Sequence, residues 1–266
     1  MKKRDKILFL ILLAVFLFAA GYFLYYHVAL GKNEEIYDEL AKESRITEAP
    51  VSPSPTPEAV KKAEDTPTPT EAPKADIPID FQKLQEENPD IYAWIQIPGT
   101  KVDYPILQSS SDDGYYLNHT VEGAEGYPGS IYTESLNKRD FSDKNTVIYG
   151  HNMKDGTMFG GLDQYVDPAY MKEHSQVIIY TPEHQYTYQV FAAVTYDDRH
   201  ILKTYDCNDE AEFGEFLDSL SSMQNIATQF SSEVQATTKD RIITLSTCNS
   251  NNVQRFLVEA VLTNEV

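Results

Sequence analysis

Between Ile91 and Leu262 the chain consists of short runs of β-branched and aromatic residues separated by turn signals such as Pro98-Gly99 and Asp113-Gly114. Runs bounded in this way are typical of short strands joined by tight connections. Eight strands are predicted, over residues 91–97, 102–107, 130–133, 146–150, 177–181, 185–196, 241–248 and 255–262. Many short strands with little helix between them favour a mostly-β barrel or sandwich over a parallel βαβ sheet.

Two helices are predicted in the same region. A short one follows Asp80, whose carboxylate suits an N-cap, and it ends before Pro89. A longer helix is predicted between residues 209 and 223, before the last two strands. Its apolar residues recur at helical spacing, and they are Phe213, Phe216, Leu217 and Leu220.

The N-terminus carries an apolar stretch over residues 7–30. As a helix, 24 residues reach roughly 36 Å, enough to cross a hydrocarbon core of ~30 Å. A cleaved signal peptide is the alternative, since Ala19 and Ala20 are small, but Phe18 would then hold position −3 and the apolar run continues past the cut. The basic residues before the stretch predict a cytoplasmic tail over 1–6, a single-pass anchor over 7–30, and a C-terminal domain on the extracellular face of the cell membrane.

Two further segments precede the folded domain. Residues 31–46 are predicted to form a polar helical stalk, and residues 47–78 are rich in Pro, Thr and Glu. The latter composition cannot bury a core and predicts a disordered, extended linker. At ~3.1 Å per residue it could act as a spacer on the order of 90 Å long. Residues 79–266 remain as one domain of ordinary size.

The charge of the chain excludes some partners. Residues 76–266 contain 12 Lys and Arg residues and 30 Asp and Glu residues, and the whole chain has a net charge of −19. Contacts to phosphate need Lys and Arg, so no nucleic-acid partner is expected. The sequence has no Asp-rich calcium loop and no His-x-x-x-His pair, so no metal or other cofactor is expected either.

The chain has two cysteines, Cys207 and Cys248. Cys207 lies in a polar stretch, whereas Cys248 closes a strand-like run and precedes a polar loop. A disulfide between them would remove any nucleophile, and a domain of this size does not need one to build a core. We therefore predict two free thiols, with Cys248 as the reactive one and Cys207 without a role.

The last two predicted strands bring Cys248 close to Arg255. Only six residues, 249–254, join them, and so short a connection favours an antiparallel hairpin. The alternation of apolar residues places Cys248 and Arg255 on the same face. A thiol needs a nearby base or cation to become a nucleophile, and a guanidinium suits a developing oxyanion.

A histidine is the expected acid and base. His119, His174, His184 and His200 lie in polar contexts that favour solvated surface positions, and His27 is in the anchor. His151 follows a buried-looking strand directly, and strand ends commonly carry site residues. The residues alone leave His151 as one candidate among several.

Two segments resemble class B sortases, which are cysteine transpeptidases of Gram-positive cell walls. Residues 145–159 are similar to the histidine segment of that class, and Thr244-Leu-Ser-Thr-Cys248 matches the Thr-Leu-x-Thr-Cys signature. Residues 114–120 and the helix over 209–223 are also similar. The resemblance implies a closed eight-stranded β-barrel with an N-terminal helical addition. It also implies a triad of His151, Cys248 and Arg255.

The reaction implied by the resemblance is acyl transfer. Cys248 attacks the Thr carbonyl of a sorting signal of the Asn-Pro-x-Thr or Pro-x-Thr-Gly type, Arg255 stabilises the oxyanion, and His151 protonates the leaving amine. The partners implied are surface proteins that carry the signal, and a peptidoglycan amine or a pilin lysine that resolves the thioester. Substrate-groove residues are expected by the same resemblance, and they are Asn118, Ser246 and Thr247.

Other classes remain as alternatives. An L,D-transpeptidase expects Ser-x-Gly-Cys at its nucleophile, whereas Ser-Thr precedes Cys248 here. An NlpC-type peptidase places its Cys before its His, the reverse of the order of His151 and Cys248. A non-catalytic surface module with a buried structural cysteine is the third alternative.

Overall fold

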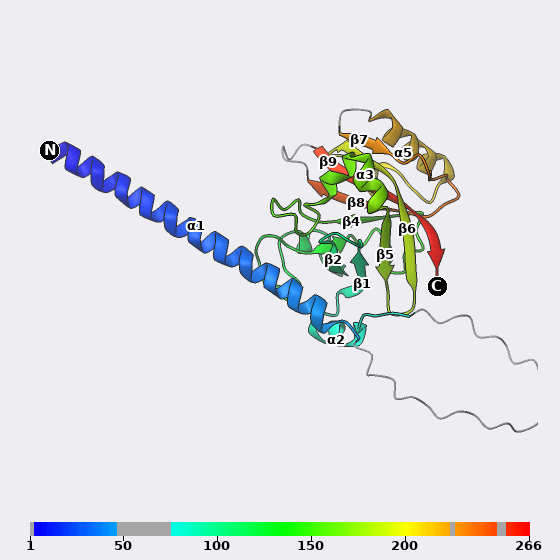
Figure 1. The fold of residues 1–266 in the computed structure, drawn as a ribbon, viewed down its shortest axis with the longest axis horizontal. Coiled ribbons are helices and arrows are strands. Elements are labelled where there is room, and N and C mark those ends of the chain that lie inside the picture. Colours follow the sequence, from blue (N-terminus) through cyan, green and yellow to red (C-terminus); the bar gives the residue numbers. More distant parts are fainter. Residues whose placement is uncertain (1–2, 47–75, 224–226, 249–253) are drawn as a thin grey trace, which may run out of the picture.

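The computed structural model describes residues 3–46, 76–223, 227–248 and 254–266 (Figure 1). The helices are α1 (Lys3–Glu43), α2 (Phe81–Glu87), α3 (Pro168–Glu173), α4 (Ile201–Thr204) and α5 (Glu210–Ser222), with short helical turns η1 (Tyr115–Leu117) and η2 (Leu162–Val166). The strands are β1 (Ile91–Gln96), β2 (Asp103–Leu107), β3 (Ile131–Thr133), β4 (Asn145–Tyr149), β5 (Gln176–Tyr180), β6 (Gln185–Asp197), β7 (Thr228–Phe230), β8 (Ile242–Cys248) and β9 (Gln254–Glu265).

Eight of the strands close into a mixed barrel. Their order is β5-β1-β2-β3-β4-β8-β9-β6, and pairing of β5 with β6 completes the ring. The β2–β3 and β4–β8 pairs are parallel. All eight predicted strands are present, and the prediction of a closed barrel is confirmed. The three-residue strand β7 (Thr228–Phe230), which adds to β6, was not predicted.

The predicted helices are also present. The Asp80 carboxylate accepts from the backbone N–H of Lys83, so it caps α2 as expected. Asp209 caps α5, and this helix buries Phe213 and Phe216 against the outer face of the barrel. Strand β9 therefore has two buried faces, with one set of side chains in the barrel interior and the other beneath α5.

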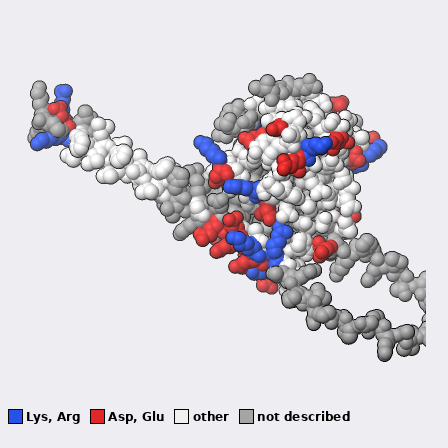
Figure 2. All heavy atoms as spheres, in the orientation of Figure 1, with Lys and Arg blue, Asp and Glu red and all other residues white. Residues whose placement is uncertain are grey.

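The N-terminal half of α1 is exposed and apolar. The window Arg4–Leu24 is long enough and apolar enough to cross a membrane, and none of it is buried inside the structure. Figure 2 shows charged residues at the N-terminal tip of α1 and uncharged ones over the part of the helix that follows. An exposed apolar helix of this length suits a hydrocarbon environment.

The C-terminal end of α1 packs on the barrel. Tyr37 and Leu40 are buried in the same core as the barrel interior, and Ser44 is 1 % exposed. Arg45 pairs with both carboxylate oxygens of Asp103 at 2.7 Å. The segment expected to be a polar stalk is thus helical, and its last turns are part of the domain.

The predicted linker over 47–78 begins and ends at one place. Residues 47–75 lie outside the described part, but Arg45 and Ile79 form an isolated antiparallel bridge beside them. The backbone N–H of Ile46 donates to the carbonyl of Pro78 at 2.9 Å, and that of Asp80 donates to the carbonyl of Ser44 at 2.8 Å. These bonds join the end of α1 to the start of the barrel domain on both sides of residues 47–75, and the predicted spacer itself lies outside the described part.

A buried carboxyl group lies between β8 and β9. Glu259 is 0 % exposed, and burial raises its pKa to about 8. Its Oε2 is 2.8 Å from Thr244 Oγ1, which is also 3.0 Å from Asn145 Oδ1. One hydroxyl proton cannot serve both acceptors. A protonated Glu259 that donates to Thr244, which in turn donates to Asn145, satisfies both contacts.

The shifted pKa of Glu259 is expected to make the stability of the protein depend on pH. Because the pKa of Glu259 is about 8 in the folded state and near 4.5 in the unfolded state, its contribution is fully present below pH 4.5 and is lost as the pH rises to about 8. Between these two pKa values the free energy of unfolding falls by at most about 1.4 kcal/mol per pH unit through this group. Glu259→Gln is expected to flatten the change in Tm between pH 5 and pH 8, measured by thermal denaturation. Glu210→Gln, on an exposed residue, serves as the control, and an unchanged slope in Glu259→Gln would contradict the assignment.

Candidate active site

Three strand ends meet at one end of the barrel. Strand β8 lies between β4, with which it is parallel, and β9, with which it is antiparallel. Tyr149 pairs with Ser246, and His151 and Cys248 each follow by two residues. The parallel β4–β8 pair therefore brings the candidate histidine to the level of the candidate nucleophile, although 97 positions separate the two in the sequence.

His151 leaves β4 through Gly150. A Cβ at Gly150 would come within 2.5 Å of Ile131 Cδ1, so glycine allows the close approach of the chain to the barrel core. His151 Nε2 lies 2.7 Å from the carbonyl oxygen of Leu117. Since a carbonyl only accepts, Nε2 carries the proton, and Nδ1 is the acceptor nitrogen of the neutral ring.

The electrostatic setting keeps His151 neutral near pH 7. Burial of the half-buried ring lowers its pKa below the ordinary 6.5, and the bond to the Leu117 carbonyl offsets this only in part. The Tyr127 ring lies 4.8 Å from the imidazole and helps to cover it. A neutral imidazole is the form that can accept a proton from a thiol.

Cys248 and Arg255 are directly opposite in the β8–β9 pair. The predicted antiparallel hairpin is therefore confirmed. Arg255 is half-buried, and its neighbours Phe256 and Leu257 are buried on opposite faces of β9. The backbone of Cys248 is described as the last residue of β8, whereas its side chain and residues 249–253 lie outside the described part.

A pocket of about 290 Å³ opens at this place. Among the residues predicted from the sequence, it is lined by His151, Ser246, Thr247 and Arg255. Thr247 Oγ1 is buried and has no hydrogen-bond partner among the residues that the structure describes. Asn118 is exposed at the end of η1 and is not among the lining residues.

The pocket also contains a histidine that the sequence interpretation placed on the surface. His200 Nε2 lies 2.6 Å from Glu134 Oε2, and the exposed fractions of the two side chains are 28 % and 14 %. His200 is therefore partly buried and paired rather than freely solvated. Glu134 follows β3 and His200 follows β6, two elements far apart in the sequence, so no local pattern indicated their contact.

A second arginine lines the same pocket. Arg199 Nε is 2.7 Å from Asp197 Oδ1, and its NH1 donates to the Tyr205 hydroxyl at 2.8 Å. Its charge is therefore already compensated by Asp197. Arg241 lies at the opposite end of β8, where it pairs with Glu265.

A family model described as the sortase domain matches residues 95–263, well over half of the chain. The chain belongs to the sortase family. The match covers all strands of the barrel except the first four residues of β1 and the last two of β9, and it decides against an L,D-transpeptidase and an NlpC-type peptidase.

Similar proteins place this sortase in class B. The sortase B of Listeria monocytogenes is 38 % identical over 174 residues, which cover 64 % of this chain and 68 % of that protein. The sortase B of Staphylococcus aureus is 34 % identical over 185 residues, covering 68 % and 73 %. A solved sortase B from Bacillus anthracis superposes with a TM-score of 0.69 at 25 % identity and covers 90 % of this chain and 99 % of its own. The chain is thus a sortase B-type transpeptidase.

The second cysteine of this sortase is not available for chemistry. Cys207 is a free thiol, so it forms no disulfide with Cys248, and it is 5 % exposed between the barrel and α5. Burial raises its pKa to about 12, which keeps it protonated. The prediction of a free Cys207 is confirmed, although the residue is buried rather than in a polar loop. Within the described residues no cluster of His, Cys, Asp or Glu could hold a metal ion.

Proposed function

We propose that this sortase cleaves a C-terminal sorting signal through a thioester on Cys248 and transfers the protein to a cell-wall peptidoglycan amine. His151 and Arg255 complete the triad. The observation that supports this assignment is the meeting of the ends of β4, β8 and β9 beside one pocket. Ser246 and Thr247 line that pocket and would contact the signal. Asn118 does not line it, so the pocket does not support the substrate-binding role predicted for that residue.

The reaction runs in two acyl transfers. The Cys248 sulfur attacks the Thr carbonyl carbon of the signal while the thiol proton passes to Nδ1 of His151. Arg255 stabilises the tetrahedral oxyanion. The C–N bond then breaks, and His151 returns the proton to the leaving amine. An acceptor amine attacks the thioester, loses a proton to His151, and releases Cys248, which recovers that proton.

The sorting motif and the acceptor are the open choices. A solved Staphylococcus aureus sortase B is described as a substrate complex, and another sortase B as complexed with triglycine. We propose a signal of the Asn-Pro-x-Thr type, with Pro-x-Thr-Gly as the alternative. A glycine-like peptidoglycan amine is the proposed acceptor, with a pilin lysine as the alternative.

We also propose that α1 anchors the enzyme in the cell membrane by a single pass. Its apolar window Arg4–Leu24 supports a membrane location, and the four basic residues among positions 2–6 favour a cytoplasmic N-terminus. The barrel would then lie on the extracellular face, where proteins that carry the signal are exported. Antibody access to an N-terminal tag on intact cells would contradict this orientation.

The full chain in detergent, incubated with peptides of both motifs and with triglycine, tests the reaction. We expect cleavage after Thr, a product that joins the peptide to triglycine, and an acyl adduct whose mass maps to the fragment that contains Cys248. His151→Ala is expected to abolish cleavage. His200→Ala is the matched control, because His200 lines the same pocket but its Nε2 is bound to Glu134. Full activity in His151→Ala, or loss only in His200→Ala, would contradict the role of His151.

A further inference from the structure

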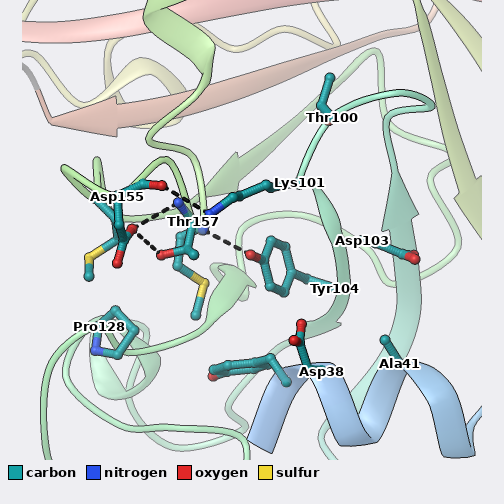
Figure 3. A pocket seen from close by; sticks show the side chains of 12 residues that line it. Asp38, Ala41, Thr100, Lys101, Asp103, Tyr104, Pro128, Asp155 and Thr157 are labelled. Atoms are coloured by element: carbon teal, nitrogen blue, oxygen red, sulfur yellow. Dashed lines mark hydrogen bonds between the residues drawn. The ribbon is translucent and has the colours of Figure 1, made fainter. Parts of the chain in front are cut away.

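The C-terminal end of α1 lines a pocket beside the loop that follows His151. This second pocket, of about 300 Å³, lies between α1, β2 and that loop (Figure 3). Tyr37 of α1 and Tyr104 of β2 both line it. The same helix carries the apolar window, so one continuous element links the membrane segment to this pocket.

Tyr37 holds the segment around Gly129 through its hydroxyl group. The hydroxyl donates to the carbonyl of Gly129 at 2.7 Å and lies 3.0 Å from Ser130 Oγ. It also accepts from the backbone N–H of Val121 at 3.3 Å. The Tyr37 side chain is 4 % exposed, and burial raises its pKa to about 12. The phenol is therefore neutral, and a donor, throughout the range in which an enzyme of this kind works.

Gly129 lies close to the carbonyl group that accepts from His151. Its φ is +67°, and a Cβ there would lie 2.4 Å from the carbonyl oxygen of Leu117. That oxygen is the acceptor of His151 Nε2. Tyr127, two residues before Gly129, covers the imidazole ring. The segment fixed by Tyr37 thus supplies a ring contact to His151 and supports its hydrogen-bond acceptor.

A second set of contacts connects Tyr37 to His151, through Tyr104 and the loop that follows the histidine. The Tyr104 ring packs edge-on against the Tyr37 ring at 5.6 Å, and the Tyr104 hydroxyl accepts from the backbone N–H of Met158 at 3.1 Å. Figure 3 shows Tyr104 pointing from β2 toward this loop. Met158 and Asn152 form an isolated antiparallel β-bridge, and the backbone N–H of Phe159 donates to the carbonyl of His151 at 3.0 Å. The loop that carries His151 is therefore held from both of its ends.

We propose that Tyr37 is a positioning residue for His151, so that the membrane-anchored helix α1 is part of the catalytic scaffold. The proposal rests on the proposed role of His151 as acid and base. A displacement of a catalytic group by about 1 Å can cost on the order of 10² in rate, so a single hydrogen bond that fixes its support is enough to matter.

Tyr37→Phe in the full chain in detergent is the test, because it deletes only the hydroxyl group. We expect kcat to fall about 10-fold with little change in KM. NMR titration of His151 should show its pKa moving up toward 6.5 as the ring becomes less enclosed, and the acid limb of the kcat profile should move with it. Tyr186→Phe is the matched control. Its side chain is also buried and its hydroxyl donates to a carbonyl, that of Asp140, at 3.0 Å, but it lies at the far end of β6.

The outcomes separate the two proposals. Equal kcat and an equal pKa of His151 in Tyr37→Phe and Tyr186→Phe would overturn the positioning role, whatever the loss of stability. Activity that survives His151→Ala would refute the proposed triad. In that case the NMR titration in Tyr37→Phe still decides whether Tyr37 controls the setting of His151.

Discussion

Cys248→Ala is expected to abolish both hydrolysis and transfer of a sorting peptide. A covalent mechanism has no route without its nucleophile, and the loss of kcat should be on the order of 10⁶, in practice below detection. The acyl adduct should disappear with it. The measurement is peptide cleavage by the full chain in detergent, with intact-protein mass spectrometry to detect the thioester.

Cys207→Ala is the matched control for that experiment. Cys207 is buried between the barrel and α5, and its pKa of about 12 keeps it protonated. Its replacement should lower Tm modestly and leave kcat within about two-fold, because surface and core changes remote from a site act mainly on stability. Comparable losses of activity in the two variants would contradict the assignment of Cys248 as the nucleophile.

Arg255→Ala is expected to lower kcat by ~10²–10³ and to change KM only modestly. The removal of one oxyanion donor typically has this size, and the donor acts on charge that develops after the substrate has bound. Arg255→Lys keeps the charge but loses the planar pair of donors, so it should recover little. Circular dichroism establishes that the fold is retained.

Arg199→Ala distinguishes this role from a general need for positive charge. Arg199 lines the same pocket, but Asp197 and the Tyr205 hydroxyl already bind its guanidinium. Its loss should therefore cost much less than the loss of Arg255. Near-normal turnover in Arg255→Ala, with a steep loss in Arg199→Ala, would overturn the argument from the β8–β9 register.

Local patterns in the sequence were sufficient for the elements of the barrel. Alternation and turn residues predicted all eight barrel strands, and helical spacing predicted α5, because both signals lie within a few neighbouring residues. The short connection after Cys248 predicted its pairing with Arg255, since a hairpin of this length leaves few other arrangements. The apolar stretch at the N-terminus predicted a helix able to cross a membrane for the same local reason.

Contacts between distant segments were decided only by the tertiary structure. The parallel β4–β8 pair, which brings His151 to the level of Cys248, joins residues about a hundred positions apart, and no local pattern specifies such a partner. The same is true of the His200–Glu134 contact in the pocket. His151 was identified from family resemblance, whereas its neutral state follows from burial that only the folded chain produces.

The N-terminal part of the chain shows the same division. The sequence by itself determined that residues 7–30 are apolar, that 47–78 cannot build a core, and that a β domain follows. Only the tertiary structure decided that the end of α1 packs on the barrel and that the buried Tyr37 donates to the carbonyl of Gly129. Composition records the polarity of a segment, but whether a few of its side chains are buried depends on the shape of a surface built from other parts of the chain.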